Sequence, residues 1–132
     1  MGSVFTPTTF RKAGSPEELV RRFADIMRRR YCAELYIFGS RARGDAGKHS
    51  DYDIVAVSGL FEGVKTTSRV EDRVILWLEA GGWGQALDLH CYTPEEFSME
   101  IADGPGYLGR AMERRELVPV ASSGTNLPSL DV

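Results

Sequence analysis

The sequence predicts an α/β domain in which helices pack against a mixed β-sheet. Amphipathic segments with helical spacing alternate with short apolar runs that are rich in β-branched and aromatic residues, and turns containing Gly or Pro separate them. The 132 residues, 42% hydrophobic and 27% charged, suit one globular domain. We expect this domain to span residues 1–121 and the Ser-, Gly-, Asn- and Pro-containing residues 122–132 to form a loose tail.

The first predicted helix begins at Ser15-Pro16 and continues to about Arg30. Ser15 is a favoured N-cap residue, Pro16 suits the first helical position, and Glu18 completes a capping box. Leu19 and Phe23 begin an apolar stripe along one side. The arginines on the other faces either contact RNA or an acidic partner or form a solvated surface.

Two apolar strands flank a Gly-Ser turn. Residues 35–38 form the first strand, Gly39-Ser40 ends it and opens a short helix, and residues 51–57 form a second, central strand. Ten residues separate Ser40 from Asp51. This order places the turn beside the start of the second strand.

The turn and the second strand carry complementary chemistry. A strand-to-helix turn offers backbone N–H groups to an anion, and Gly39 lets a phosphate approach closely because it has no side chain. Asp51 and Asp53, two residues apart, point to the same side, whereas Tyr52 points to the core. Paired carboxylates repel unless a cation lies between them, and Mg²⁺ suits oxygen ligands and substrate phosphates. The pattern therefore predicts a metal–nucleotide site.

The third predicted strand, residues 85–92, places Asp88 in an otherwise apolar run. Leu89 and Cys91 face one side, whereas Asp88 and His90 face the other. A charge within a buried strand is costly unless it is paired or binds a metal. Asp88 is therefore either a metal ligand or the partner of an arginine such as Arg41 or Arg43.

The remaining elements follow from turn and periodicity signals. Both Cys32 and Cys91 are expected to be small buried hydrophobic residues. A helix is predicted from Thr66 or Thr67 to Gly81, with a stripe of Val70, Val74, Trp77 and Leu78 that is widened by Ile75 and Leu76. The other predicted elements are a helix from Pro94 to about Ala102 capped by Thr93, helical turns over residues 107–115, and an edge strand over residues 117–121.

At Gly39, Ser40, Asp51 and Asp53 the chain resembles the DNA polymerase β-type nucleotidyltransferase superfamily. It is most similar to the minimal nucleotidyltransferase (MNT) branch, whose signature is Gly-Ser, ten residues, then Asp-x-Asp. The extended form Ser-x-Ala-Arg-Gly is also present at residues 40–44. The resemblance implies a single small nucleotidyltransferase fold with a mixed sheet packed by helices.

The resemblance also implies roles for individual residues. Asp51, Asp53 and Asp88 would hold two Mg²⁺ ions and carry catalysis, with Asp88 as the third carboxylate from a neighbouring strand. Gly39 and Ser40 would bind the phosphates of ATP. We include Arg41 and Arg43 among the nucleotide-binding residues as charge stabilisers, although either could instead brace Asp88 or the loop. His49 and His90 lie near the site without an assigned role.

The resemblance implies transfer of AMP from ATP to a hydroxyl of a partner protein, in the manner of MNT antitoxins that are paired with helical HEPN-domain proteins. The alternatives are a catalytically silent inhibitor that binds a nucleotide or partner, and a transferase for a small, aminoglycoside-like acceptor. The net charge of −3 argues against direct nucleic-acid binding. No membrane span is predicted, a reducing cytoplasm is expected, and a homo-oligomer is left open.

Overall fold

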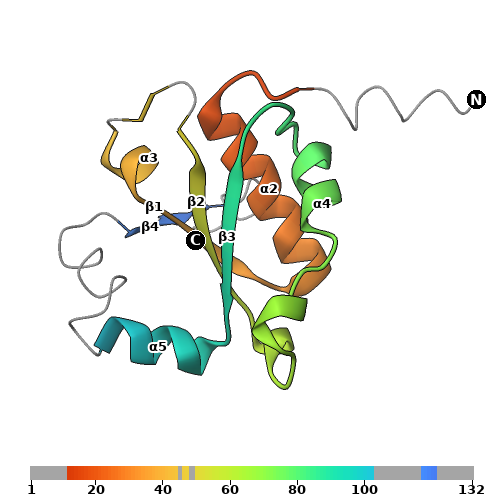
Figure 1. Ribbon diagram of the computed structural model, residues 1–132, viewed down its shortest axis with the longest axis vertical. Helices are drawn as coiled ribbons and strands as arrows, with labels where there is room; N and C mark the ends of the chain where they lie inside the picture. Colours follow the sequence, from red (N-terminus) through yellow and green to blue (C-terminus); the bar gives the residue numbers. More distant parts are fainter. Residues whose placement is uncertain (1–11, 45, 48–49, 103–116, 122–132) are drawn as a thin grey trace, which may run out of the picture.

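The computed structural model describes residues 12–44, 46–47, 50–102 and 117–121. Four strands form one sheet in the order β3-β2-β1-β4 (Figure 1). The antiparallel pairs are β1 with β2 and β1 with β4, whereas β2 and β3 are parallel. The predicted mixed α/β sheet is therefore confirmed, as are the central position of β2 and the edge position of β4. The strands are β1 (Glu34–Phe38), β2 (Tyr52–Val57), β3 (Leu87–Tyr92) and β4 (Leu117–Val120).

Helices cover both faces of the sheet. Figure 1 shows α2 and α4 on one side of β2 and β3, and α3 and α5 on the other. The helices are α2 (Pro16–Tyr31), α3 (Ser40–Arg43), α4 (Arg73–Glu79) and α5 (Pro94–Ala102), and two short 3₁₀ turns, η2 (Gly59–Phe61) and η3 (Thr66–Ser68), lie in the connection from β2 to α4. None of the helices in the described ranges has the length and apolar character needed to cross a bilayer.

The first helix begins as predicted because its capping residues act locally. The Ser15 side chain accepts a hydrogen bond from the Glu18 N–H at 3.1 Å, and Pro16 follows at the first helical position. The apolar stripe of α2 then packs on the sheet and on α4, where the Phe23 and Trp77 rings meet edge-on with their centres 5.1 Å apart. Three of its arginines form intrachain ion pairs: Arg22 with Glu18, Arg28 with Glu34 and Arg30 with Asp72.

The sheet has an apolar core on each face. Under α2 and α4, Tyr52 and Ile54 of β2 are fully buried, so the prediction that Tyr52 points to the core is confirmed. On the opposite face, a smaller cluster forms around Phe38, Val55 and Leu117. The odd-numbered residues of β2 therefore point to this second face, and Asp53, near the start of the strand, is one of them.

The helix predicted from Thr66 or Thr67 is interrupted. Val70 adopts a left-handed φ of 52°, and α4 begins only at Arg73. Because the helix starts again at Arg73 with a different orientation, Val74 and Ile75 point outward, with 65% and 61% of their surface exposed. The predictions that Val74 and Ile75 belong to the buried stripe are wrong; Val70 and Trp77 are buried as expected.

Two further expectations were also wrong. Cys32 is exposed because it follows α2 in the left-handed C-cap position, although Cys91 is buried as predicted. Asp88 lies on an edge strand rather than in a buried one, and its side chain is 56% exposed. The predicted turns over residues 107–115 and the tail over 122–132 lie outside the described residues, so the proposed domain boundary stays a prediction.

Candidate active site

The site is built around Gly39, where β1 ends and α3 begins. Gly39 has φ 77° and ψ −153°, a conformation that disfavours residues with a side chain. Its carbonyl accepts hydrogen bonds from the N–H groups of Ala42 and Arg43, and these bonds close the first turn of α3. A Cβ at this position would lie 2.6 Å from Oδ2 of Asp53. The backbone of the Gly-Ser turn therefore lies directly against the carboxylate of β2.

Two of the three predicted carboxylates are neighbours across the sheet. Asp53 of β2 and Asp88 of β3 are register partners in parallel strands, and their side chains are on the same face. Burial raises the pKa of Asp53, and the charges of Asp88 and Asp51 and a hydrogen bond with Asp88 raise it further. Neighbouring carboxylates repel each other when they are all ionised, and a bound cation relieves this repulsion.

The third carboxylate, Asp51, is exposed immediately before β2 and lies close enough to Asp53 to affect its ionisation. Asp88 is instead contacted by His90, whose Nε2 lies 3.4 Å from Oδ2 of the carboxylate. The His90 ring also packs near Phe38, with the ring centres 5.7 Å apart. The sequence placed His90 on the Asp88 face of its strand, but the contact itself depends on the local side-chain conformation.

The two arginines predicted to bind the nucleotide, Arg41 and Arg43, both lie in α3. The Arg41 guanidinium stacks over the Tyr52 ring at 3.8 Å and donates to the Ser50 carbonyl at 2.8 Å. Because Tyr52 points away from Asp53, Arg41 is on the opposite side of the sheet, and this position favours the predicted alternative that it braces the loop. Arg43 is exposed in the last turn of α3, and Ser40 begins that helix next to Gly39.

The carboxylates beside the Gly39 turn suit a divalent cation in type, and two of them are already neighbours. Neighbouring carboxylates at the end of two strands are suitable ligands for a hard cation such as Mg²⁺. Across the described ranges, however, no three His, Cys, Asp or Glu side chains are grouped closely enough to hold a metal ion as they stand. The Asp53–Asp88 pair thus provides a suitable pair of ligands, and Asp51 would have to turn toward it to become a third.

Comparison with known proteins agrees with this geometry. Residues 20–118 match the family model of the nucleotidyltransferase domain. The chain belongs to this nucleotidyltransferase family. A Sulfolobus solfataricus protein of known structure, provisionally assigned as a nucleotidyltransferase, is 20% identical, and the alignment covers 86% of each chain with a TM-score of 0.50. At this identity the likeness shows a shared fold. No curated protein matches the chain.

The close approach of Gly39 to Asp53 in this nucleotidyltransferase domain leads to a testable prediction. We expect Gly39→Ala to lower nucleotidyl transfer by at least about tenfold, because the new Cβ must displace the Asp53 carboxylate. Gly44→Ala is the matched control, since Gly44 also has a positive φ of 88° but its Cβ would meet nothing within 4 Å. Gly39→Ala should also lose more thermal stability than Gly44→Ala, because the Gly39 backbone lies in a region that glycine alone adopts readily and its Cβ would meet Asp53. Equal activities in the two folded variants would contradict the prediction.

Proposed function

We propose that this domain transfers AMP from ATP to a hydroxyl group of a partner protein in a Mg²⁺-dependent reaction. Membership in the nucleotidyltransferase family supports nucleotidyl transfer in general. The observation that carries the proposal is the pairing of Asp53 with Asp88 across β2 and β3, directly beside the Gly39 turn. Acidic ligands thereby lie next to a backbone segment that can accommodate phosphates.

In this proposal Asp51, Asp53 and Asp88 hold two Mg²⁺ ions. When bound, these ions would neutralise the phosphate charge and stabilise the attacking and leaving oxygens of an in-line displacement. Holding the acids close together costs the apo domain free energy, because burial and the neighbouring charges already raise the pKa of Asp53. Release of that repulsion would favour cation binding.

The chain's own groups would position the reactants. At Gly39 a phosphate can approach the backbone, and the Ser40 hydroxyl can donate a hydrogen bond to it. Asp88 is the more accessible of the paired acids, with 56% of its side chain exposed. We propose that it accepts the proton of the acceptor hydroxyl while the new oxygen–phosphorus bond forms at the α-phosphate and pyrophosphate leaves.

The acceptor hydroxyl is proposed to belong to another protein, as the resemblance to the MNT branch implies. By resemblance to the MNT branch, the partner would be a helical HEPN-type protein whose activity the transferred AMP blocks, so that the domain acts as an antitoxin.

The test uses ATP labelled at either the α- or the γ-phosphate, with Mg²⁺ and the co-expressed neighbouring gene product. We expect the α-label to become covalently attached to the partner, whose intact mass should rise by one or more AMP groups, and the γ-label to appear in pyrophosphate. Labelling of an added aminoglycoside alone would favour a small-molecule transferase. Complex formation without label transfer would favour the silent inhibitor and would overturn the proposal.

A further inference from the structure

One guanidinium group holds the residues on both sides of Asp51. Cζ of Arg41 lies 3.8 Å from the centre of the Tyr52 ring, and Nη2 of Arg41 donates to the Ser50 carbonyl at 2.8 Å. Ser50 and Tyr52 are the chain neighbours of Asp51. Because the same side chain holds both neighbours, the backbone of Asp51 has little freedom to rotate.

Further hydrogen bonds fix the backbone before and after this acid. The Tyr52 N–H donates to the Ala86 carbonyl at 2.8 Å, and this bond ties the start of β2 to the residue before β3. On the other side, the Ser50 N–H donates to the Gly47 carbonyl at 3.2 Å, and the Gly47 N–H donates to Oγ of Ser50 at 2.9 Å. The turn that ends at Ser50 is therefore closed, and the Arg41 guanidinium joins it to β2.

The same arrangement sets the direction of the Asp51 side chain. The Tyr52 ring is buried in the core under α2, and Arg41 stacks on it from that side of the sheet. Side chains alternate along an extended chain, so Asp51 is directed to the opposite face, which is that of Asp53. The pKa of Asp53 is raised by burial, then by the charge of Asp88 and then by that of Asp51, in agreement with this placement.

Arg41 reaches this position because it belongs to α3. Its neighbour Ser40 begins that helix directly after Gly39, and a Cβ at Gly39 would lie 2.6 Å from Oδ2 of Asp53. The short helix therefore connects the Gly-Ser turn to two acids, to Asp53 by direct approach and to Asp51 through Arg41. Backbone hydrogen bonds to the Gly39 carbonyl close the first turn of α3, so loss of the Arg41 contacts would free Asp51 and leave the turn in place.

We propose that Arg41 is a positioning residue for Asp51: by holding both chain neighbours of this acid, it keeps the carboxylate within reach of the Asp53–Asp88 pair. This role rests on the proposed function, because it belongs to the proposed cation site. A guanidinium suits the role, since its plane can stack on a ring while an N–H in that plane donates to a carbonyl. Arg41 then supports cation binding from the far side of the sheet and not by contact with a phosphate.

Magnesium binding, measured by isothermal titration calorimetry without ATP or a partner protein, tests this role. Arg41→Lys should weaken Mg²⁺ binding by about tenfold, the low end of the loss when a group that orients a metal ligand is removed. Asp51→Asn should weaken it at least as much. In the Asp51→Asn background, adding Arg41→Lys should cause no further loss, because the two residues act as one unit. Arg21→Lys, on the exposed surface of α2, should keep the wild-type affinity.

Circular dichroism and thermal melts establish first that each variant is folded. If Arg41→Lys does not fold, Arg41→Met carries the test, since methionine keeps packing against the Tyr52 ring but cannot donate to the Ser50 carbonyl. Wild-type Mg²⁺ affinity in the folded variant overturns the proposal, as does an equal loss in the wild-type and Asp51→Asn backgrounds. Weaker ATP binding with unchanged Mg²⁺ binding would place Arg41 at the nucleotide and overturns it as well.

Asp53→Asn separates a failure of this role from a failure of the proposed function. If Asp53→Asn abolishes Mg²⁺ binding while Arg41→Lys and Asp51→Asn leave it unchanged, the cation site stands and only the role of Arg41 is wrong. If the wild type binds Mg²⁺ neither alone nor with ATP, the proposed function fails and the role of Arg41 fails with it.

Discussion

Asp53→Asn is expected to lower nucleotidyl transfer by at least about 10²–10³-fold, the typical loss when a charge-stabilising group is removed from an active site. Asp53 is the acid that contacts both other parts of the site, since it pairs with Asp88 and lies against Gly39. Asparagine keeps the shape of the side chain but removes the charge. Release of pyrophosphate from Mg²⁺-ATP in the presence of the acceptor measures the effect.

The same variant should be as stable as the wild type at neutral pH, or more stable. The pKa of Asp53 is raised in the folded state, chiefly by burial and then by the charges of Asp88 and Asp51. The folded state therefore binds more protons than the unfolded state between the two pKa values, and wild-type stability falls as the pH rises through that window. The variant lacks this carboxyl and should not show that loss.

Thermal melts with and without Mg²⁺ separate the effect of Asp53→Asn on cation binding from its effect on stability. Mg²⁺ should raise the melting temperature of the wild type by mass action and should raise that of Asp53→Asn much less. Glu71→Gln, which removes an exposed carboxylate from the connection before α4, should respond to Mg²⁺ as the wild type does. Full activity in Asp53→Asn, or the same Mg²⁺ response, would contradict the assignment of this residue.

Local signals predicted the parts of the site that depend on nearest neighbours. The spacing from Gly39 to Asp53 indicated a turn beside the start of a strand, and the structure places Gly39 against the Asp53 carboxylate. The alternation in residues 85–92 placed Asp88 and His90 on one face of β3. These features follow from the two-residue period of a strand and from the need for glycine at a positive φ.

The sequence could not predict features that depend on tertiary arrangement. Strand order decides that β3 is an edge strand, and an apolar run does not distinguish edge from centre; hence the exposure of Asp88 was missed. Arg41 lies on the Tyr52 side, where it stacks on the Tyr52 ring and donates to the Ser50 carbonyl, and no local sequence pattern indicates these contacts. The left-handed Val70 interrupts an otherwise regular helical pattern, and no Gly or Pro marks the interruption.

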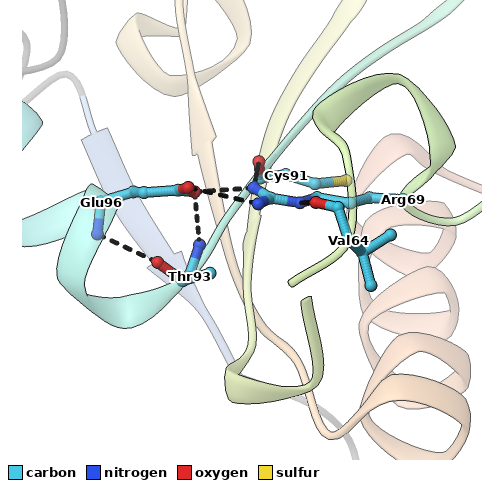
Figure 2. Close-up of polar contacts among 5 residues, drawn as sticks. All are labelled: Val64, Arg69, Cys91, Thr93 and Glu96. Atoms are coloured by element: carbon cyan, nitrogen blue, oxygen red, sulfur yellow. Dashed lines mark hydrogen bonds and ion pairs between the residues drawn. The ribbon is translucent and has the colours of Figure 1, made fainter. Parts of the chain in front are cut away.

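Arg69→Met is expected to lower the free energy of unfolding by about 3 kcal/mol, the largest loss among the variants considered. This value is the low end of the cost of breaking a buried ion pair, because Glu96 is partly exposed. Arg69 is only 6% exposed, and its guanidinium joins the Val64 loop, the Cys91 carbonyl of β3 and the start of α5 (Figure 2). Methionine would retain much of the packing but leave both carbonyls without their donor. Denaturant unfolding measures the difference.

The size of this effect should depend on pH. The hydrogen bond from Arg69, and then that from the Thr93 backbone, lower the pKa of Glu96 in the folded state. The folded state therefore favours the ionised carboxylate, and the stabilisation is complete above the unfolded pKa and is lost as the pH falls through the lowered one. The gap between wild type and Arg69→Met should accordingly be larger near about pH 7 than near about pH 3.

Arg28→Met is the matched control for burial. Arg28 also contacts a glutamate with both terminal nitrogens, at 3.2 and 3.1 Å to Glu34, but the two side chains are 38% and 59% exposed. An exposed pair contributes about 0–1 kcal/mol, so this substitution should have a small effect. Equal losses in the two variants would mean that Arg69 contributes only as a surface ion pair. A larger loss in Arg69→Met would attribute the difference to its buried carbonyl contacts, which also cover the edge of β3.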